Sequence, residues 1–190
     1  MARFTNQAQL RYGNAVTNSN IAVGEILEVL SATKTAVRNT YGQSDTVTYI
    51  VSIVNSGTTP ITGISVTDNL GEYTFGTITL VPLTYIEGTV KYYVNGVLQP
   101  SAVVTAGPPL VVSGITVPAG GSVTVVYEAA VNEFAPLDTT SVINNTAIVA
   151  GTGITPITAE EEITVESTPV LTITKSVSPV PVTENGTLTY

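Results

Sequence analysis

Three polar residues occupy strand positions that would direct their side chains into an apolar core. Alternate residues of a β-strand face opposite sides of the sheet. By this rule Lys34, Asp68 and Asn145 each point inward. Their faces are shared by Leu30, Ala32 and Ala36 for the lysine, Ile64 and Val66 for the aspartate, and Ile143, Ala147 and Val149 for the asparagine. Because an unpaired buried polar group is costly, we expect these side chains to pair or to react.

These residue types can form a Lys–Asn isopeptide bond. Desolvation lowers the pKa of a buried lysine and raises that of a buried aspartate, so the pair can rest as a neutral amine and a protonated acid. The amine of Lys34 would attack the side-chain carbonyl of Asn145. Protonated Asp68 would stabilise the charge that develops on the carbonyl oxygen. Loss of ammonia would then leave a covalent bond between the first and last strands of a domain.

Two non-covalent arrangements fit the same pattern. One is a buried salt bridge between Lys34 and Asp68, with Asn145 satisfying the remaining donors. The other places these side chains at sheet edges, from which they extend to water. The chain has only three lysines, and Lys34 and Lys175 occupy equivalent positions of a repeat. This repetition favours the chemical interpretation.

The repeat itself covers both ends of the chain. The segment Leu30–Lys34 recurs as Leu171–Lys175, and the strand that ends at Tyr49 recurs as the segment that ends at Tyr190. Near the other end, Phe4–Ala8 reads like Ile143–Ala147. Such self-similarity is typical of a tandem array. We expect a donor-type strand over residues 1–12, a linker over 13–28, a sandwich domain over 29–166, and the first strands of a second, incomplete repeat over 167–190.

The fold class follows from composition and periodicity. Hydrophobic residues make up 43% of the chain and charged residues 11%, which excludes disorder caused by low hydropathy and high charge. Short runs with period-two alternation, such as Val47–Ile53, are separated by turn signals such as Asn95-Gly96. Residues 73–80 are expected to form one further strand. The pattern predicts an all-β, immunoglobulin-like antiparallel sandwich with Greek-key connections, seven or more strands and almost no helix.

The absent residue types exclude several function classes. There is no histidine and no cysteine, so no Ser-His-Asp triad, Cys-His pair or ordinary zinc site can form. We expect no cofactor, no metal and no enzyme activity beyond autocatalytic bond formation. The net charge of −8 argues against nucleic acid as a partner, and no segment is suited to membrane insertion. Glu160–Glu162 lacks the pattern of a calcium loop and is interpreted as a solvated charge run.

A family resemblance adds to this interpretation. The stretch Val47–Gly57, followed by Ile64–Asp68 and Asn144–Ala147, resembles a widespread immunoglobulin-like repeat of bacterial surface proteins. The opening Arg3–Ala8 is similar to subunits of ribbon-like appendages on the endospores of anaerobic, clostridial-type bacteria. In pilin and adhesin domains of Gram-positive bacteria, a lysine on the first strand, an asparagine on the last and an acid between them form isopeptide bonds. The resemblance implies a location on a spore or cell surface, outside the cell.

The ends of the chain predict self-assembly. Phe4, Asn6, Ala8 and Leu10 share one face of the first strand, which matches the final strand of a domain. A free strand seeks a sheet edge, so this strand would complete the C-terminal domain of the next subunit. A head-to-tail homopolymer would result, attached if needed to a surface anchor protein, with Lys175 of one subunit bonded to Asn6 of its neighbour.

The alternative function is an adhesin stalk or a module that binds carbohydrate or protein. Tyr85, Tyr92 and Tyr93 would then form an aromatic platform for a sugar, although tyrosines in strands more often pack in the core or across strands.

Overall fold

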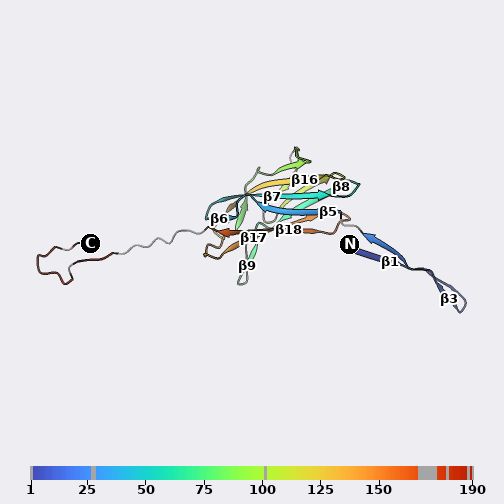
Figure 1. Cartoon of the computed structure of the whole chain (residues 1–190), viewed down its shortest axis with the longest axis horizontal. Helices are drawn as coiled ribbons and strands as arrows, with labels where there is room; N and C mark the ends of the chain where they lie inside the picture. The colour runs from blue at the N-terminus through green and yellow to red at the C-terminus, as the bar shows by residue number, and fades with distance from the viewer. Residues whose placement is uncertain are drawn as a thin grey trace.

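The structure is a computed structural model that describes residues 2–26, 29–100, 102–166, 175–178, 180–187 and 189. Every regular element in these ranges is a β-strand, and two stacked sheets form the body of the molecule (Figure 1). Among the described residues, no helix has the length and apolar character needed to cross a membrane.

One layer of the sandwich is an antiparallel sheet in the strand order β13-β12-β16-β7-β5, with β11 also paired to β16. Its two longest strands, β7 and β16, lie side by side at its centre. The strands are β5 (Leu30–Ala36), β7 (Thr46–Asn55), β11 (Leu83–Tyr85), β12 (Lys91–Val94), β13 (Val97–Leu98) and β16 (Ser122–Val131).

The other layer has the order β14-β15-β8-β17-β18-β6, and only the β18–β6 pair is parallel. Its strands are β6 (Thr40–Tyr41), β8 (Ile61–Asp68), β14 (Val103–Thr105), β15 (Leu110–Val117), β17 (Val142–Ala150) and β18 (Ile157–Val165). The prediction of an all-β, immunoglobulin-like sandwich is confirmed. One detail differs: Asn145 lies on β17, and β18 follows it, so the asparagine is on the next-to-last strand of the domain.

The core lies between the two layers and is built by strict alternation. In β7, Val47, Tyr49, Val51 and Ile53 are fully buried, and the residues between them are partly exposed. The inward residues of β16 continue this layer. Full burial of a side chain of this size contributes about 1.5–3 kcal/mol, so the alternation fixes which face of each strand turns inward.

Turn chemistry explains two of the connections. Asn95 and Gly96 have φ values of 49° and 79° and join β12 to β13, as the sequence predicts for a tight hairpin. Residues 73–80 form a hairpin of β9 (Tyr73–Phe75) and β10 (Ile78–Leu80). The prediction of one strand there was wrong because Gly76, with φ 63°, reverses the chain.

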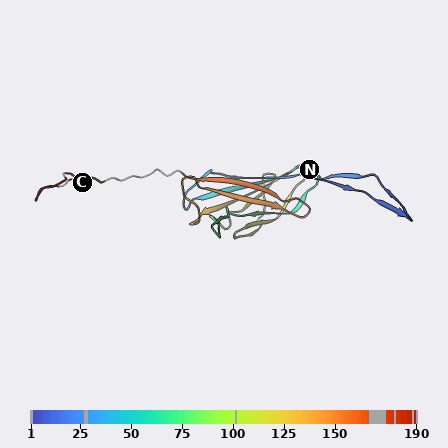
Figure 2. The same cartoon turned by 90° about the horizontal axis from the view of Figure 1, so that it is seen from below.

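The N-terminal segment is a two-stranded ribbon that extends from one end of the sandwich (Figures 1 and 2). In it β1 (Ala2–Asn6) pairs with β4 (Ala22–Ile26), and β2 (Gln9–Tyr12) pairs with β3 (Ala15–Asn18). The expectation of a lone strand followed by a linker over residues 13–28 is therefore wrong for its described part, residues 13–26. Gly13 and Asn14 form a turn rather than opening a linker, and the chain returns along the first strand.

The C-terminal described segment lies beyond the opposite end of the sandwich (Figures 1 and 2). Within it, Ser178 and Thr189 form an antiparallel bridge through two backbone hydrogen bonds of 3.0 and 2.9 Å. A second repeat is predicted over residues 167–190. Its residues 167–174, 179, 188 and 190, which include Leu171 and Ile173 of the repeated motif, lie outside the described residues.

Candidate functional site

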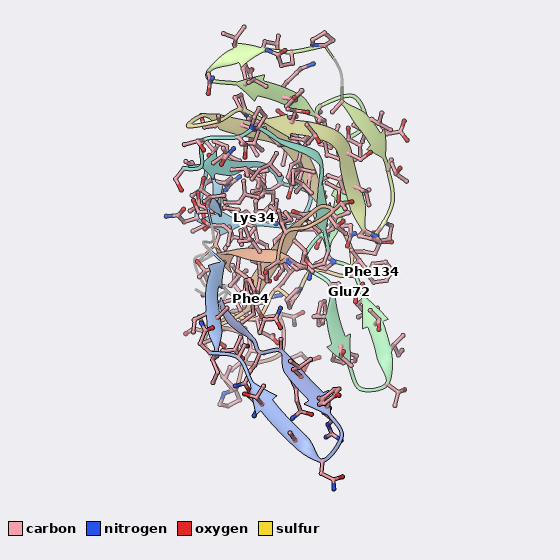
Figure 3. All side chains as sticks on the ribbon, turned by 90° about the vertical axis from the view of Figure 1, so that its right-hand side faces the viewer. Phe4, Lys34, Glu72 and Phe134 are labelled. Atoms are coloured by element: carbon pink, nitrogen blue, oxygen red, sulfur yellow. The ribbon has the colours of Figure 1, made fainter. Side chains whose placement is uncertain are left out.

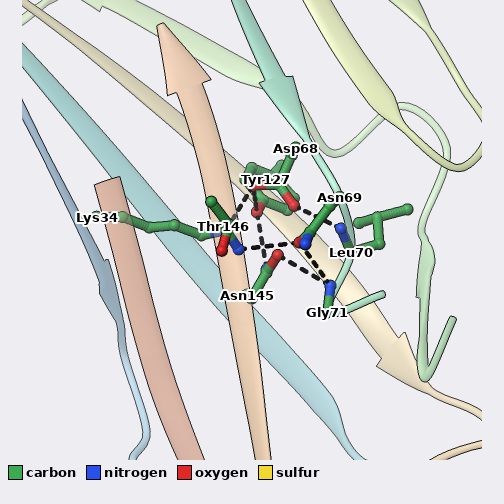
Figure 4. A network of polar contacts seen from close by, with 8 residues as sticks. All are labelled: Lys34, Asp68, Asn69, Leu70, Gly71, Tyr127, Asn145 and Thr146. Carbon is green, nitrogen blue, oxygen red and sulfur yellow. Dashed lines mark hydrogen bonds and ion pairs between the residues drawn. The ribbon is translucent and has the colours of Figure 1, made fainter. Parts of the chain in front are cut away.

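Lys34, Asp68 and Asn145 meet in the core between the two sheets (Figure 4). Lys34 comes from β5 in one sheet, and Asp68 and Asn145 come from β8 and β17 in the other. Their exposed fractions are 4%, 1% and 0%. The position of each residue on the inward side of its strand thus places all three in one water-poor cluster.

The lysine and the aspartate form a buried ion pair. Lys34 Nζ donates a hydrogen bond to Asp68 Oδ2 at 2.6 Å, and Nζ also lies 4.9 Å from the centre of the Tyr49 ring. Burial lowers the pKa of Lys34 to about 8, although the charges of Asp68 and, more weakly, Glu161 act in the opposite direction. The ammonium group therefore releases its proton more readily here than in water.

Asp68 holds further donors with both carboxylate oxygens. Tyr127 donates its hydroxyl proton to Oδ2 at 2.5 Å, and the backbone N–H of Leu70 donates to Oδ1 at 3.0 Å. Burial, together with the charge of Asp68, raises the pKa of Tyr127 well above its ordinary value. The phenol therefore stays protonated and remains a donor to the carboxylate.

Both ends of the Asn145 amide are engaged. Its Nδ2 donates to the Tyr127 hydroxyl at 3.3 Å, and its Oδ1 accepts the backbone N–H of Gly71 at 3.2 Å. A donor aimed at the carbonyl oxygen polarises the carbon toward a nucleophile. The amide nitrogen, which would leave in an acyl transfer, faces a hydroxyl group that is itself bound to Asp68.

The loop after β8 positions these donors. Leu70 and Gly71 both have positive φ, 55° and 75°, so the backbone turns its N–H groups toward the cluster. Asn69 Oδ1 accepts the N–H groups of Gly71 and of Thr146 on β17, which ties the loop to the strand that carries the asparagine. A Cβ at position 71 would lie 2.6 Å from Ile143 Cγ2. Glycine is therefore required at this position for space as well as for conformation.

Sequence reasoning missed two residues of the site. One is Tyr127, whose hydroxyl links Asp68 to Asn145. Glu161 is directly opposite Asn145 in the β17–β18 ladder and is half-buried, between the inward residues Ala159 and Ile163. The interpretation of Glu160–Glu162 as a solvated run holds for the exposed outer pair and is wrong for Glu161. The alternation of Ala159, Glu161 and Ile163 was the signal that could have identified it.

Tyr49 is the buried neighbour of Tyr127 and has a different role. The two rings stack with centroids 5.6 Å apart. The Tyr49 hydroxyl lies near the Asn145 amide but makes no hydrogen bond among the described residues. The Tyr49 ring contacts the Lys34 ammonium group. The Tyr127 hydroxyl, in contrast, forms hydrogen bonds with Asp68 and Asn145.

The residues expected to join subunits lie far from this cluster. Asn6 is on β1 of the ribbon, where it is exposed, as are Phe4, Ala8 and Leu10. Lys175 is exposed in the C-terminal described segment. The ribbon that carries Asn6 and the segment that carries Lys175 lie beyond opposite ends of the sandwich (Figures 1 and 2).

The tyrosines considered as a sugar platform do not share a surface. Tyr85 is buried in the core, and Tyr92 packs against it. Tyr93 follows Tyr92 in β12 and so faces the other side of the sheet. These positions are typical of tyrosines that pack within the fold and not of tyrosines that together form a sugar-binding surface.

Comparison with known structures agrees with this architecture. SpaD, the major pilin of Corynebacterium diphtheriae, matches with a TM-score of 0.51 and 15% identity over 70% of this chain and 33% of SpaD. RrgB, the pilus backbone of Streptococcus pneumoniae, matches with a TM-score of 0.50 and 14% identity over 64% of this chain and 31% of RrgB. A variant of BcpA, the major pilin subunit of Bacillus cereus, matches with a TM-score of 0.50 and 10% identity over 85% of this chain and 47% of BcpA.

The chain thus spans between about a third and a half of these pilins. At such identities the likeness shows a shared fold and no more. No protein-family model matches the sequence, and no curated protein is similar to it. The chain has the immunoglobulin-like sandwich that these bacterial pilin structures contain.

Proposed function

We propose that this protein is a structural subunit of a fibre on a bacterial surface, and more specifically of an endospore appendage, in which isopeptide bonds make the domains and their junctions covalent. The observation that carries the proposal is the buried Lys34–Asp68–Asn145 cluster inside a sandwich of the type found in pilins. The endospore setting rests on the resemblance of the opening residues 3–8 to appendage subunits.

The geometry supports a balanced reaction. The ammonium proton of Lys34 moves along the 2.6 Å hydrogen bond to Asp68, which gives a neutral amine and a carboxylic acid. The amine nitrogen bonds to Cγ of Asn145, and the carbonyl electrons move to Oδ1, where the Gly71 N–H stabilises them. When the carbonyl re-forms, the C–N bond to Nδ2 breaks. The departing nitrogen gains one proton and leaves as ammonia, and the former amine loses one proton and keeps a single N–H.

Tyr127 is placed to move a proton in the last step. Its hydroxyl donates to Asp68 and accepts from Asn145 Nδ2, so it lies between the acid and the leaving group. A proton passed from Asp68 through the hydroxyl to Nδ2 would help the nitrogen to leave, and the carboxylate would then take up the proton that the former amine loses. Tyr127 would end the cycle unchanged.

A purely structural ion pair is the competing account of this cluster. A buried ion pair often contributes little net stability, because desolvation offsets the attraction. Two features go beyond what an ion pair needs: an asparagine amide with both ends hydrogen-bonded, and a loop in a left-handed conformation that aims an N–H group at its carbonyl. Both features would serve an acyl transfer.

Assembly would be head-to-tail by β-strand donation. Phe4 and Asn6 on β1 and Leu10 on β2 are exposed in this chain, with Phe4 57% exposed and Leu10 68% exposed. A neighbouring subunit whose domain begins with the segment around Lys175 would cover that face. Asn6 would then occupy the place of Asn145, and Lys175 that of Lys34, so a second isopeptide bond would join the subunits. Such a contact does not close on itself and propagates as a filament.

Electron microscopy and denaturing gels test this function together. The purified protein should form filaments, and heating in detergent should leave a ladder of covalent oligomers. The Asn6→Ala variant should still form filaments, but these should dissociate to monomers in hot detergent. A protein that stays monomeric at high concentration, with no filaments, would rule out the fibre function.

A further inference from the structure

The outer half of the N-terminal ribbon exposes apolar side chains. There β2 and β3 pair with each other over four residues each, and the ribbon tip is defined here as residues 9–18. Tyr12 is 88% exposed, and Leu10 and Val16 are exposed as well. A two-stranded hairpin alone is marginally stable in water and is normally supported by packing against other elements. The ribbon tip therefore has an apolar surface suited to a partner.

The ribbon tip is also basic. Arg11 is the only charged residue between positions 4 and 24, whereas the whole chain has a net charge of −8. Its side chain is exposed, and its Nε donates a hydrogen bond to Gln9 Oε1 at 2.8 Å. That bond uses one of the five N–H donors of a guanidinium group. The tip thus combines a cation with an exposed aromatic side chain, Tyr12, next to it in the sequence.

The loop between β16 and β17 has the complementary features. This acidic loop, residues 132–141, lies at the end of the sandwich from which the chain leaves toward the C-terminal segment (Figure 1). Phe134 and Leu137 are 45% and 49% exposed. Glu133 and Asp138, which flank them, are exposed, and the loop contains no basic residue. Two acids therefore surround two exposed apolar side chains.

A third acid extends this surface. The Tyr73 hydroxyl donates a hydrogen bond to the Phe134 carbonyl oxygen at 2.7 Å, so the exposed Glu72 lies beside the acidic loop (Figure 3). Arg38, at the same end of the sandwich, already pairs with Asp45 at 2.9 Å. It is therefore engaged elsewhere, and the acidic loop keeps its negative charge.

The proposed head-to-tail assembly brings the ribbon tip within reach of the acidic loop of another copy. In that assembly Asn6 of one copy meets Lys175 of the next. Tyr12 is six residues beyond Asn6, or about 20 Å along a strand. Lys175 is ten residues beyond Val165, or at most about 35 Å of extended chain. Val165 in turn donates its backbone N–H to the carbonyl oxygen of Ser141, at the end of the acidic loop.

We propose that the ribbon tip of one copy docks on the acidic loop of a second copy. Arg11 faces the two acids of the loop, and Tyr12 covers its two exposed apolar side chains. The inference rests on the proposed head-to-tail assembly and adds to it a contact with the central domain. Opposite charges steer association and fix how two surfaces align. The tip gains the apolar packing that a two-stranded hairpin needs.

Charge exchange in the full-length protein tests this contact. Arg11→Glu and the double variant Glu133→Arg/Asp138→Arg each place like charges together. Each should raise the lowest protein concentration that gives filaments by at least about fivefold. The three substitutions combined restore opposite charges and should return this concentration to within about twofold of the unmutated value. Glu160→Arg/Glu162→Arg is the matched control, because it makes the same change in net charge at exposed positions of β18.

The control should neither weaken assembly nor rescue Arg11→Glu. If the combined variant assembles no better than Arg11→Glu alone, or if Arg11→Glu assembles normally, the tip does not meet the loop. Docking on the loop is then wrong while the fibre function stands. Equal rescue by the control would contradict the contact too, because the effect would follow net charge alone. If the unmutated protein never assembles, the fibre function fails, and this inference with it.

Discussion

Asp68 Oδ2 accepts two hydrogen bonds in a site closed to water, one from Lys34 Nζ at 2.6 Å and one from the Tyr127 hydroxyl at 2.5 Å. The same hydroxyl accepts a hydrogen bond from Asn145 Nδ2 at 3.3 Å. The acid therefore connects directly to the nucleophile and, through one phenol, to the leaving group.

The two stacked tyrosines should differ in their effect on the reaction. Tyr127→Phe removes the hydroxyl between Asp68 and Asn145, so the rate of ammonia loss should fall by at least about tenfold. The measurement is the intact mass of newly synthesised protein as a function of time. Tyr49→Phe is the matched control, because it removes a buried hydroxyl that makes no hydrogen bond to the part of the chain that the structure describes. Equal rates for the two variants would contradict the role of Tyr127.

The rate of bond formation should depend on the protonation of Lys34. Burial lowers the pKa of this group to about 8, and the amine attacks only after its proton has moved to Asp68. The reactive pair holds as many protons as the ion pair, so the rate should be level below about 8 and should fall above it, where the pair loses this proton. Glu161→Gln removes a charge that raises the lysine pKa, so the midpoint of this profile should move to lower pH. A rate that rises with pH between about 6 and 8 would contradict the mechanism.

The free energy of unfolding of the domain without the isopeptide bond should also depend on the protonation of Lys34. Asn145→Ala cannot form the bond, and its Lys34 titrates near 8 when folded and near 10.5 when unfolded. Between these values the unfolded state binds more protons, so the free energy of unfolding should rise with pH, by about 3 kcal/mol at most. Chemical denaturation at several pH values measures this rise in the free energy of unfolding. Asn145→Ala/Lys34→Met should lose this rise, and an equal rise in both variants would assign it to another group.

Gly71 should tolerate substitution less well than Gly76. Both have positive φ, 75° and 63°, so alanine introduces backbone strain at each. Only at position 71 would the new Cβ also meet Ile143, and displacing that side chain should cost about 1–3 kcal/mol more. Thermal or chemical denaturation of the two alanine variants gives the comparison. A Gly76→Ala variant as destabilised as Gly71→Ala would mean that the contact with Ile143 is unimportant.

The sequence predicted the fold and the inward residues of the site because both follow from period-two alternation. Lys34, Asp68 and Asn145 sit among apolar residues of their own strands, and that pattern is local. Tyr127 was not identified because a tyrosine on an inward face normally packs as a core residue. Its role depends on which strand of the opposite sheet lies across from it, which alternation does not specify.

The ribbon was missed for a related reason. The similarity of residues 4–8 to residues 143–147 identified β1, but the segment opposite has Ala22 and Gly24 where β18 has Glu161 and Ile163. These residues share no chemical type, so sequence similarity failed there although the register is the same. The pairing became visible only with the backbone hydrogen bonds.

The intact mass of the folded, unmutated protein tests the bond between Lys34 and Asn145 most directly. The mass should lie below the sequence mass by one ammonia, and digestion should release a linked peptide pair that contains Lys34 and Asn145. Lys34→Met, Asp68→Asn and Asn145→Ala should each restore the full mass. They should also lose several kcal/mol of stability, because the bond closes a loop of more than about 100 residues. A folded, unmutated protein with its full sequence mass would mean that Lys34 and Asn145 are not bonded.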